Sequence, residues 1–154
     1  MTHKYIEATP VVTVGAYASL DAVGGKLEFE DACTAFQNSG RICRAYVTDK
    51  GKQDALLYLV LFSEDFTATA DNAAFDVTDA DLLNVMAVLE FAVADYGTFN
   101  DNSIATLGFD NLEVSVPFVL AEGGTSIFGQ LYVKTSTPTY TATDDIRVRL
   151  VVHN

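Results

Sequence analysis

The sequence predicts an all-β protein: an antiparallel β-sandwich of the jelly-roll or a similar Greek-key type, with eight to nine strands and one short helical turn. Three observations carry this prediction. Apolar and polar residues alternate along most segments between the turns, with the period of two that half-buried strands show. No segment has the length and period of a helix that could connect two parallel strands. The loops differ in length, which favours a jelly roll over an even up-and-down barrel.

Eight segments have the composition and pattern of strands, and a ninth short apolar piece, residues 104–107, lies within loop-rich sequence at 95–111. The eight are 11–17, 21–30, 41–48, 55–62, 85–93, 112–120, 127–135 and 146–152. Pro117 indicates an edge strand or a strand end, because proline cannot donate a hydrogen bond to a sheet ladder. Residues 78–84 predict a single helical turn, with Thr78 as its N-cap and acidic residues where the helix dipole favours them.

Residues 21–30 show the clearest alternation. Val23, Leu27 and Phe29 fall on one face, and charged side chains fall on the other. This pattern is typical of a half-buried antiparallel strand. The pair Gly24-Gly25 interrupts the segment without any phosphate-binding glycine motif around it, and it predicts a bulge or the close approach of another backbone.

The segment 55–62 is the most apolar run of the chain, and with residues 41–48 it predicts a hairpin around a turn at 49–52. Alternate leucines occupy one face of this strand, and the opposite face is also apolar. The opposite face includes Tyr58, Val60 and Phe62. Neither face suits contact with water. A partner subunit or the connection 64–76, folded back over the strand, must cover the second face, and the sequence alone leaves both alternatives open.

Arginines occupy outward positions on two strands. The last strand, 146–152, places Arg147 and Arg149 outward between aliphatic residues that point inward. Arg44 has an outward position on residues 41–48, and Arg41 begins that segment. An amphipathic face of this kind suits an exposed sheet surface or a subunit contact.

Residues 1–8 have no clear period and precede Pro10, so we expect a flexible N-terminal arm that either dangles or lies on a neighbouring subunit. Residues 9–154 are then expected to form a single β-sandwich domain. A chain of 154 residues is long enough for one proper hydrophobic core.

Charge and composition exclude several classes of protein. The formal net charge is −12, with 21 acidic and 9 basic residues, which disfavours binding to nucleic acid or to anionic membrane surfaces. No apolar run approaches the roughly 20 residues of a membrane-spanning helix. The first residues lack the apolar core and cleavage site of a secretory signal, so we expect synthesis and folding in a cytoplasm.

The residues that usually carry catalysis are scarce. The two histidines, His3 and His153, stand at opposite ends of the chain, and Cys33 and Cys43 are too few for a zinc site. We therefore expect no enzyme activity, no catalytic residue, no cofactor and no metal centre, with a β-sandwich hydrolase the least favoured reading. A calcium loop formed by three acidic residues stays open as an alternative. These residues are Asp95, Asp101 and Asp110.

Three segments of the first half carry a resemblance to a known group of proteins: VTVGAYASLDAVGGKLEFEDA, YVTDKGKQDALLYLVLFSED and DNAAFDVTDADL. With their A-Y-x-x-x-D-A-V-G-G, T-D-K and D-N-A-A-F-D features, the chain resembles the small acidic structural proteins of tailed bacteriophage virions, of the decoration or cement type. The second half shares only general β character with that group.

The resemblance implies a capsid decoration or cement protein that binds and stabilises the assembled shell, with no catalytic residues to carry over. It also implies the major capsid protein of the same phage as partner, a homotrimer, and a position on the capsid surface after synthesis in the host bacterial cytoplasm. The alternatives are a neck or tail component and a glycan-binding module on the virion surface. The absence of tryptophan, which sugar-binding faces often use, makes the glycan module a weaker reading.

The candidate interface residues come from three places in the sequence: the N-terminal arm, the outward arginines and the second face of 55–62. They are Lys4, Tyr5, Ile6, Arg44, Tyr58, Val60, Phe62, Arg147 and Arg149. We expect the outward arginines, Arg41 included, to contribute to contact with the shell.

Overall fold

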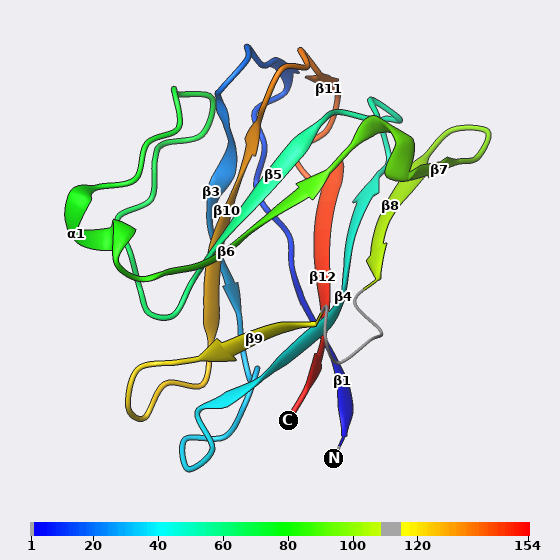
Figure 1. The fold of residues 1–154 in the computed structure, drawn as a ribbon. Coiled ribbons are helices and arrows are strands. Elements are labelled where there is room, and N and C mark those ends of the chain that lie inside the picture. The colour runs from blue at the N-terminus through cyan, green and yellow to red at the C-terminus, as the bar shows by residue number, and fades with distance from the viewer. Residues whose placement is uncertain (1, 109–114) are drawn as a thin grey trace.

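The computed structural model describes residues 2–108 and 115–154, in which two antiparallel sheets pack face to face (Figure 1). The first sheet has the order β1–β12–β4–β8–β7, and β9 pairs with the beginning of β4. Its strands are β1 (His3–Ala8), β4 (Ser39–Asp49), β7 (Tyr96–Thr98), β8 (Ser103–Gly108), β9 (Val116–Val119) and β12 (Ile146–His153). The second sheet, in the order β3–β10–β5–β6, consists of β3 (Ala22–Phe29), β5 (Leu57–Phe62), β6 (Val85–Phe91) and β10 (Ile127–Val133). The remaining elements are β2 (Gly15–Ala16), paired with β11 (Thr139–Tyr140), the helix α1 (Asp79–Leu82) and the 3-10 turn η1 (Val93–Asp95).

The connectivity of the main strands is that of a jelly roll. In chain order these strands are β1, β3, β4, β5, β6, β8, β10 and β12. The first pairs with the last, the second with the seventh, the third with the sixth and the fourth with the fifth, always antiparallel. This nested pairing places β12 and β4 in the interior of the first sheet and β10 and β5 in the interior of the second. The predicted antiparallel jelly-roll sandwich is confirmed.

The hydrophobic core lies between the two sheets. Leu57, Leu59 and Leu61 of β5 face it and are fully buried, as the alternation of this segment predicts. They belong to one continuous cluster with Val47 of β4 and Leu150 of β12. Each sheet therefore contributes one aliphatic face, which is the arrangement that a period of two demands.

The predicted hairpin over residues 41–65 is wrong. β4 and β5 lie in different sheets and do not pair, because the loop between them carries the chain across the sandwich. Asp49 organises this loop: its carboxylate accepts hydrogen bonds from the backbone N–H groups of Gly51, Gln53 and Asp54 at 2.9, 2.8 and 3.1 Å. Apolar alternation predicts that both segments are strands, but it carries no information about the partner of each strand.

The expected flexible arm is a strand. Residues 3–8 form β1, which pairs with β12 along its whole length from His3 opposite His153 to Ala8 opposite Val148. Ile6 is 5% exposed and belongs to the core cluster. An edge strand is held mainly by backbone hydrogen bonds and buries few side chains. Its sequence therefore shows little alternation of apolar and polar residues.

The chain itself covers the second face of β5. Val60 and Phe62 are buried in a small cluster with Phe66, and Phe75 packs against it from the far end of the same connection. The predicted roles of Val60 and Phe62 in a subunit interface are therefore corrected. Of the two alternatives that the sequence leaves open, the folded-back loop is the one observed.

A buried glutamine holds this covering loop against the second sheet. Gln130, on β10, is 0% exposed, and its Oε1 accepts a hydrogen bond from the Thr69 N–H at 3.0 Å. Its Nε2 donates to the carbonyl oxygens of Thr69 and Gly24 at 2.6 and 3.0 Å. One side chain thus satisfies backbone groups of both the loop and β3.

Two predicted strands are shorter than expected. Only Gly15–Ala16 of residues 11–17 is a strand, because Asp71 engages the polar groups around it: its carboxylate accepts from the Thr13 N–H, the Thr13 hydroxyl and the Tyr17 hydroxyl at 2.8, 2.6 and 2.7 Å. Of the segment 112–120, the described strand is β9, and residues 112–114 lie outside the described residues.

Three local predictions agree with the structure. Gly24 has φ +73°, a Cβ there would lie 2.4 Å from Pro10 Cβ, and the register of β3 against β10 shifts beside it. Thr78 caps α1 through its side chain, which accepts from the Asp81 N–H at 3.1 Å. Pro117 lies on β9, which pairs with β4 alone. None of the helices in the described part of the chain is long and apolar enough to span a membrane.

Candidate functional site

The outer face of the first sheet forms a continuous surface that we call the arginine face. It consists of the side chains of four neighbouring strands that point away from the core, and a register shift between β12 and β4 brings Arg41 and Arg44, three residues apart, to the same side. They are His3, Tyr5 and Glu7 of β1; Arg147, Arg149, Val151 and His153 of β12; Arg41, Arg44, Tyr46 and Thr48 of β4; and Ile104 and Thr106 of β8.

The strand register arranges these side chains in four rows across the sheet, because directly opposed residues share a face. In order along the strands, the rows are Arg147–Thr48–Ile104, Glu7–Arg149–Tyr46–Thr106, Tyr5–Val151–Arg44 and His3–His153–Arg41. Every row contains an arginine, so positive charge runs along the full length of the face.

The arginine face concentrates the cationic side chains of an acidic protein. All four arginines and both histidines of the chain lie on it, whereas the whole chain has a formal net charge of −12. Glu7 is the one acidic residue among the outward side chains that define the face. In the described part of the chain, the acidic residues other than Glu7 lie outside this set of side chains, and the set has the charge of an anion-binding surface.

Glu7 lies between two of the arginines. Its Oε2 accepts a hydrogen bond from Arg149 Nη2 at 3.3 Å, and its Oε1 lies 3.9 Å from Arg147 Nη1. The Arg149 guanidinium also stands over the Tyr5 ring, with its Cζ 5.6 Å from the ring centroid. The side chains of all three charged residues are 42–50% exposed, and ion pairs at such exposure contribute little to stability. Both guanidinium groups can therefore meet an outside anion at little cost.

Two hollows flank the histidine row at the end where both chain termini lie (Figure 1). The rings of His3 and His153 stack with centroids 4.7 Å apart and an interplanar angle of 5°. The hollow on the His3 side has about 230 Å³ and is lined by Tyr5 and Arg44 as well.

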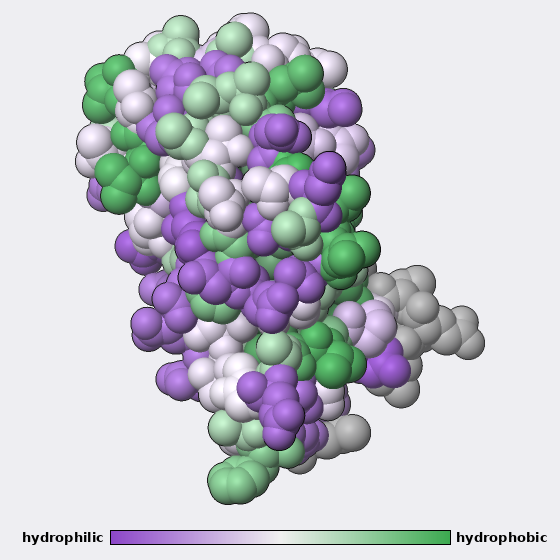
Figure 2. Space-filling view, turned by 90° about the vertical axis from the view of Figure 1, so that its left-hand side faces the viewer, coloured by the Kyte–Doolittle hydropathy of each residue, from purple (hydrophilic) through white to green (hydrophobic). Residues whose placement is uncertain are grey.

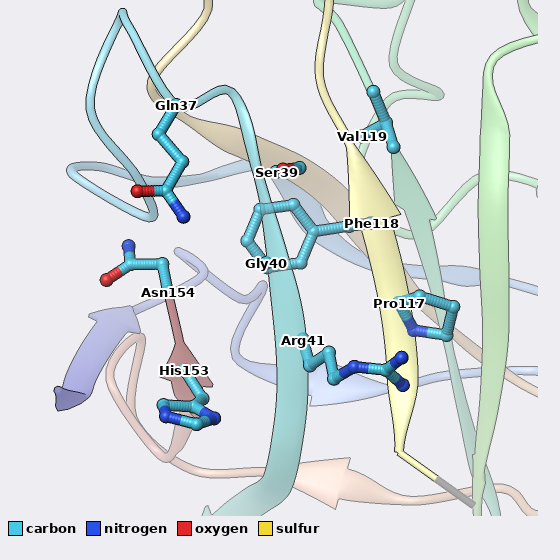
Figure 3. A pocket seen from close by; sticks show the side chains of 9 residues that line it. All are labelled: Gln37, Ser39, Gly40, Arg41, Pro117, Phe118, Val119, His153 and Asn154. Atoms are coloured by element: carbon cyan, nitrogen blue, oxygen red, sulfur yellow. The ribbon is translucent and has the colours of Figure 1, made fainter. Parts of the chain in front are cut away.

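The hollow on the His153 side has about 330 Å³ and is lined by Arg41, Phe118 and Asn154 among others (Figure 3). Arg41 points toward β9 in this view, and its Nη1 donates to the Ser115 hydroxyl at 2.9 Å. Gly40 lies under the Phe118 ring, where a Cβ would come within 2.7 Å of the ring and 2.8 Å of the His153 carbonyl oxygen. The packing at this position therefore requires a glycine.

A third hollow, which we call the far hollow, opens at the opposite end of the face and has about 340 Å³. Thr48 and Ile104 of the Arg147 row line it, together with Phe99, which is 62% exposed. Asp49 also lines it, and burial raises the pKa of this carboxyl group above its ordinary value. The far hollow combines an apolar rim with a position next to the arginines.

The structure brings four of the nine predicted interface residues together: Tyr5, Arg44, Arg147 and Arg149 lie on the arginine face. Lys4 lies at the edge of the sheet, where its Nζ donates to the Asp31 carbonyl oxygen at 3.0 Å. The remaining four do not join the face.

Those four residues lie in the core or on the other sheet. Ile6 points into the core, and Val60 and Phe62 are buried under the loop on the second sheet. Tyr58 also lies on the second sheet, where it stacks on Tyr132 with centroids 5.4 Å apart. Its hydroxyl donates to Glu90, and this hydrogen bond raises the pKa of Tyr58.

Sequence reasoning missed the contribution of the histidines. His3 and His153 stand at opposite ends of the chain, and the antiparallel pairing of the first strand with the last is what brings them into contact. Glu7 and Tyr46 are likewise absent from the predicted interface, although the alternation of residues 41–48 places Tyr46 on the same side as Arg44. Pairing the terminal strands, the hallmark of a jelly roll, is the signal that would have found them.

The opposite side of the molecule has a different character. Figure 2 views it from the side of α1 and shows hydrophilic residues across the middle of the face, with hydrophobic residues in separate patches. Leu82 and Leu83 at α1 are 60% and 88% exposed. Within residues 2–108 and 115–154, no group of three or more His, Cys, Asp or Glu side chains is placed to hold a metal ion. Asp110 of the calcium-loop alternative lies outside these ranges.

Comparison with models of protein families and with curated protein sequences finds no match. Among solved structures, the chain is similar to one in the crystal structure of tomato aspermy virus, with 10% sequence identity and a TM-score of 0.39. The similarity covers 98% of this chain and 75% of the viral chain. A likeness at this identity and TM-score carries no argument about what the present chain does.

Proposed function

We propose that this protein is a structural component of a tailed-phage virion, a capsid decoration or cement protein that binds the assembled shell through the arginine face. The observation that carries the proposal is the gathering of all four arginines on one sheet face of a chain with net charge −12. Such a molecule has one surface that attracts acidic patches and other surfaces that repel them.

This charge distribution suits reversible assembly on a lattice. The acidic surfaces keep free copies apart at high concentration, and the arginine face orients each copy as it approaches an acidic site. A shell repeats such a site many times. The proposal assigns the protein to the capsid surface after synthesis in the bacterial cytoplasm, with the major capsid protein as its partner and no catalytic role.

The fold is compatible with this role but does not define it. Jelly rolls occur in viral capsid proteins, in lectins and in cupins, so function has to be argued from the surface. The resemblance of residues 12–32, 46–65 and 71–82 to decoration-type virion proteins supports the same proposal. The homotrimer implied by that resemblance stays a prediction, because the loop over β5 already covers the apolar face that suggested a subunit contact.

The proposal is tested by adding purified protein to phage shells that lack it and locating bound copies by cryo-electron microscopy. Many copies spread over the lattice are expected. A few copies at one vertex would instead assign the protein to the neck or tail. No binding to shells, combined with affinity for a host glycan, would overturn both virion readings.

Charge variants test the face itself. Arg147→Gln with Arg149→Gln should reduce shell occupancy at limiting protein concentration. The matched control is Lys26→Gln with Lys134→Gln, which removes the same charge from residues outside the arginine face. Equal losses in the two double variants would show that net charge, and not the arginine face, determines binding.

A further inference from the structure

The arginine face joins two kinds of surface along the direction of its strands. At one end, the far hollow has an apolar rim formed by Ile104 and the exposed ring of Phe99. Lys52 holds this rim in place, because its Nζ donates to the Phe99 carbonyl oxygen at 2.7 Å. Beyond the hollow, the rows of Arg149 and Arg44 follow along the sheet. A ligand that uses the whole face must be apolar at one end and anionic along the rest.

The protein contains an internal example of such an anion. Glu7 projects from β1, an extended segment, and its carboxylate meets both Arg147 and Arg149. A carboxylate carried by an extended polypeptide is therefore a group that fits this arginine pair, and the half-exposed guanidinium groups have further donors for a second carboxylate.

The spacing of the rows defines a sequence pattern. Thr48 and Arg44 are four residues apart on β4, which corresponds to about 13 Å in an extended strand. Alternate side chains of an extended peptide point the same way at about 7 Å intervals, which is the interval between neighbouring rows. A peptide with an apolar side chain in the far hollow would thus present its second and fourth following side chains to the Arg149 and Arg44 rows.

We infer that the arginine face binds an extended acidic segment of a partner polypeptide, with a large apolar side chain in the far hollow and acidic side chains two and four residues away. This inference rests on the proposed function for the source of the segment, a protein of the shell, and it identifies the part of that protein that docks. A hollow of about 340 Å³ lies at the small end of the roughly 300–1,000 Å³ range of ligand pockets and suits a single side chain.

Charge favours a short acidic peptide over a uniform polyanion. A nucleic acid or a sulfated glycan extends beyond the face and meets the acidic remainder of a protein with net charge −12. A peptide of about five residues with two carboxylates ends within the face and also gains from burial of its apolar side chain. These other polyanions are therefore outcomes of the test and not the proposed ligand.

The test uses short synthetic peptides labelled with fluorescein and measures fluorescence anisotropy with the intact protein. The probe has the order Phe-Ser-Glu-Ser-Glu, and a second probe has the reversed order. Matched controls carry Ala for Phe, Gln for Glu, or the same residues in the order Glu-Phe-Ser-Ser-Glu. The Phe-Ser-Glu-Ser-Glu peptide should bind on the order of tenfold more tightly than the peptide with Ala in place of Phe, because the latter cannot bury a ring in the far hollow.

Two protein variants localise the contacts. Phe99→Ser should weaken binding of the Phe peptide on the order of tenfold and leave binding of the Ala peptide unchanged. This result would identify the far hollow as the binding site of the phenylalanine ring. Leu83→Ser, at an exposed leucine of the α1 side, is the control and should change neither affinity. Arg149→Gln should weaken the Phe and Ala peptides alike.

The inference is overturned if residue order has no effect on binding, if Phe99→Ser affects both peptides equally, or if single-stranded DNA or heparin fragments bind more tightly than the pattern peptide. Its failure is distinct from failure of the proposed function. If shells bind the wild type but not the arginine variants and no peptide binds, the proposed function is supported and the inference of an acidic segment is refuted. If the peptide binds but shells do not, the inference is supported and the proposed function is refuted.

Discussion

Asp49 shows how a single carboxylate can organise a crossing between sheets. Asp49 is 1% exposed, and both of its carboxylate oxygens accept hydrogen bonds from backbone N–H groups of the loop after β4. Burial raises the pKa of Asp49, each of the three backbone hydrogen bonds lowers it by less, and the nearby Asp54 raises it further. The residue is thus needed as an acceptor but is costly as a buried charge.

Replacing Asp49 tests this balance. Asp49→Asn keeps the size of the side chain but leaves one acceptor oxygen where there were two, so at least one loop N–H loses its partner. We expect the free energy of unfolding at pH 7 to fall by about 1–3 kcal/mol. Denaturant titration followed by circular dichroism measures it.

The pH dependence of that difference has a defined sign. The pKa of Asp49 is raised in the folded protein, so above the ordinary value of about 4 the folded state binds more protons than the unfolded chain. Wild type therefore gains stability from this group as the pH falls toward that ordinary value, and asparagine does not titrate. The gap between wild type and Asp49→Asn should widen as the pH is lowered, and a gap that narrows would contradict the raised pKa.

At the scale of elements, β1 behaves as part of the sandwich. Ile6→Ala should lower the free energy of unfolding by about 2–4 kcal/mol, because Ile6 is 5% exposed and its removal leaves a cavity in the core. Tyr5→Ala on the outward side, where Tyr5 is 64% exposed, should cost no more than about 1 kcal/mol. Urea denaturation compares the two, and equal small effects would mean that residues 3–8 are a loose arm after all.

The loop that covers β5 depends on the hydrogen bonds of the buried Gln130 side chain. Gln130→Leu removes partners from the Thr69 N–H and from the Thr69 and Gly24 carbonyl oxygens, so we expect a loss of about 2–4 kcal/mol in unfolding free energy. Hydrogen exchange at the Thr69 N–H should accelerate more than exchange in β12. Gln37→Leu, at an exposed position, is the control and should change neither quantity.

At the scale of the whole molecule, the separation of charge predicts salt-dependent association. The rate of binding to shells should fall as ionic strength rises, because the Debye length shortens from about 30 Å at 0.01 M to about 8 Å at 0.15 M. Arg147→Gln with Arg149→Gln should flatten this dependence, whereas the dissociation rate should depend less on salt. Light scattering after rapid mixing follows association, and a salt-independent rate in wild type would argue against electrostatic steering.

Local features of the fold could be predicted because they depend on neighbouring residues. Strand alternation predicts the inward leucines of β5, capping chemistry predicts Thr78 as the N-cap, and the Gly24-Gly25 pair predicts a bulge or close approach; each depends on only a few neighbouring residues. The outward positions of Arg147, Arg149 and Arg44 follow from the same alternation. By these local patterns the sequence itself determined the all-β class and the faces of its main strands.

The tertiary structure alone decided which strands meet. Backbone hydrogen bonds are alike for every residue, so the pairing of β1 with β12 and the separation of β4 from β5 leave no mark in a local pattern. The same long-range pairing stacks His3 on His153, and the folding of the loop over β5 removes Val60 and Phe62 from the surface. The arginine face is therefore a product of topology: alternation points Arg147, Arg149 and Arg44 outward, a register shift between β12 and β4 brings Arg41 to the same side, and the nested strand order of the jelly roll sets β12 beside β4.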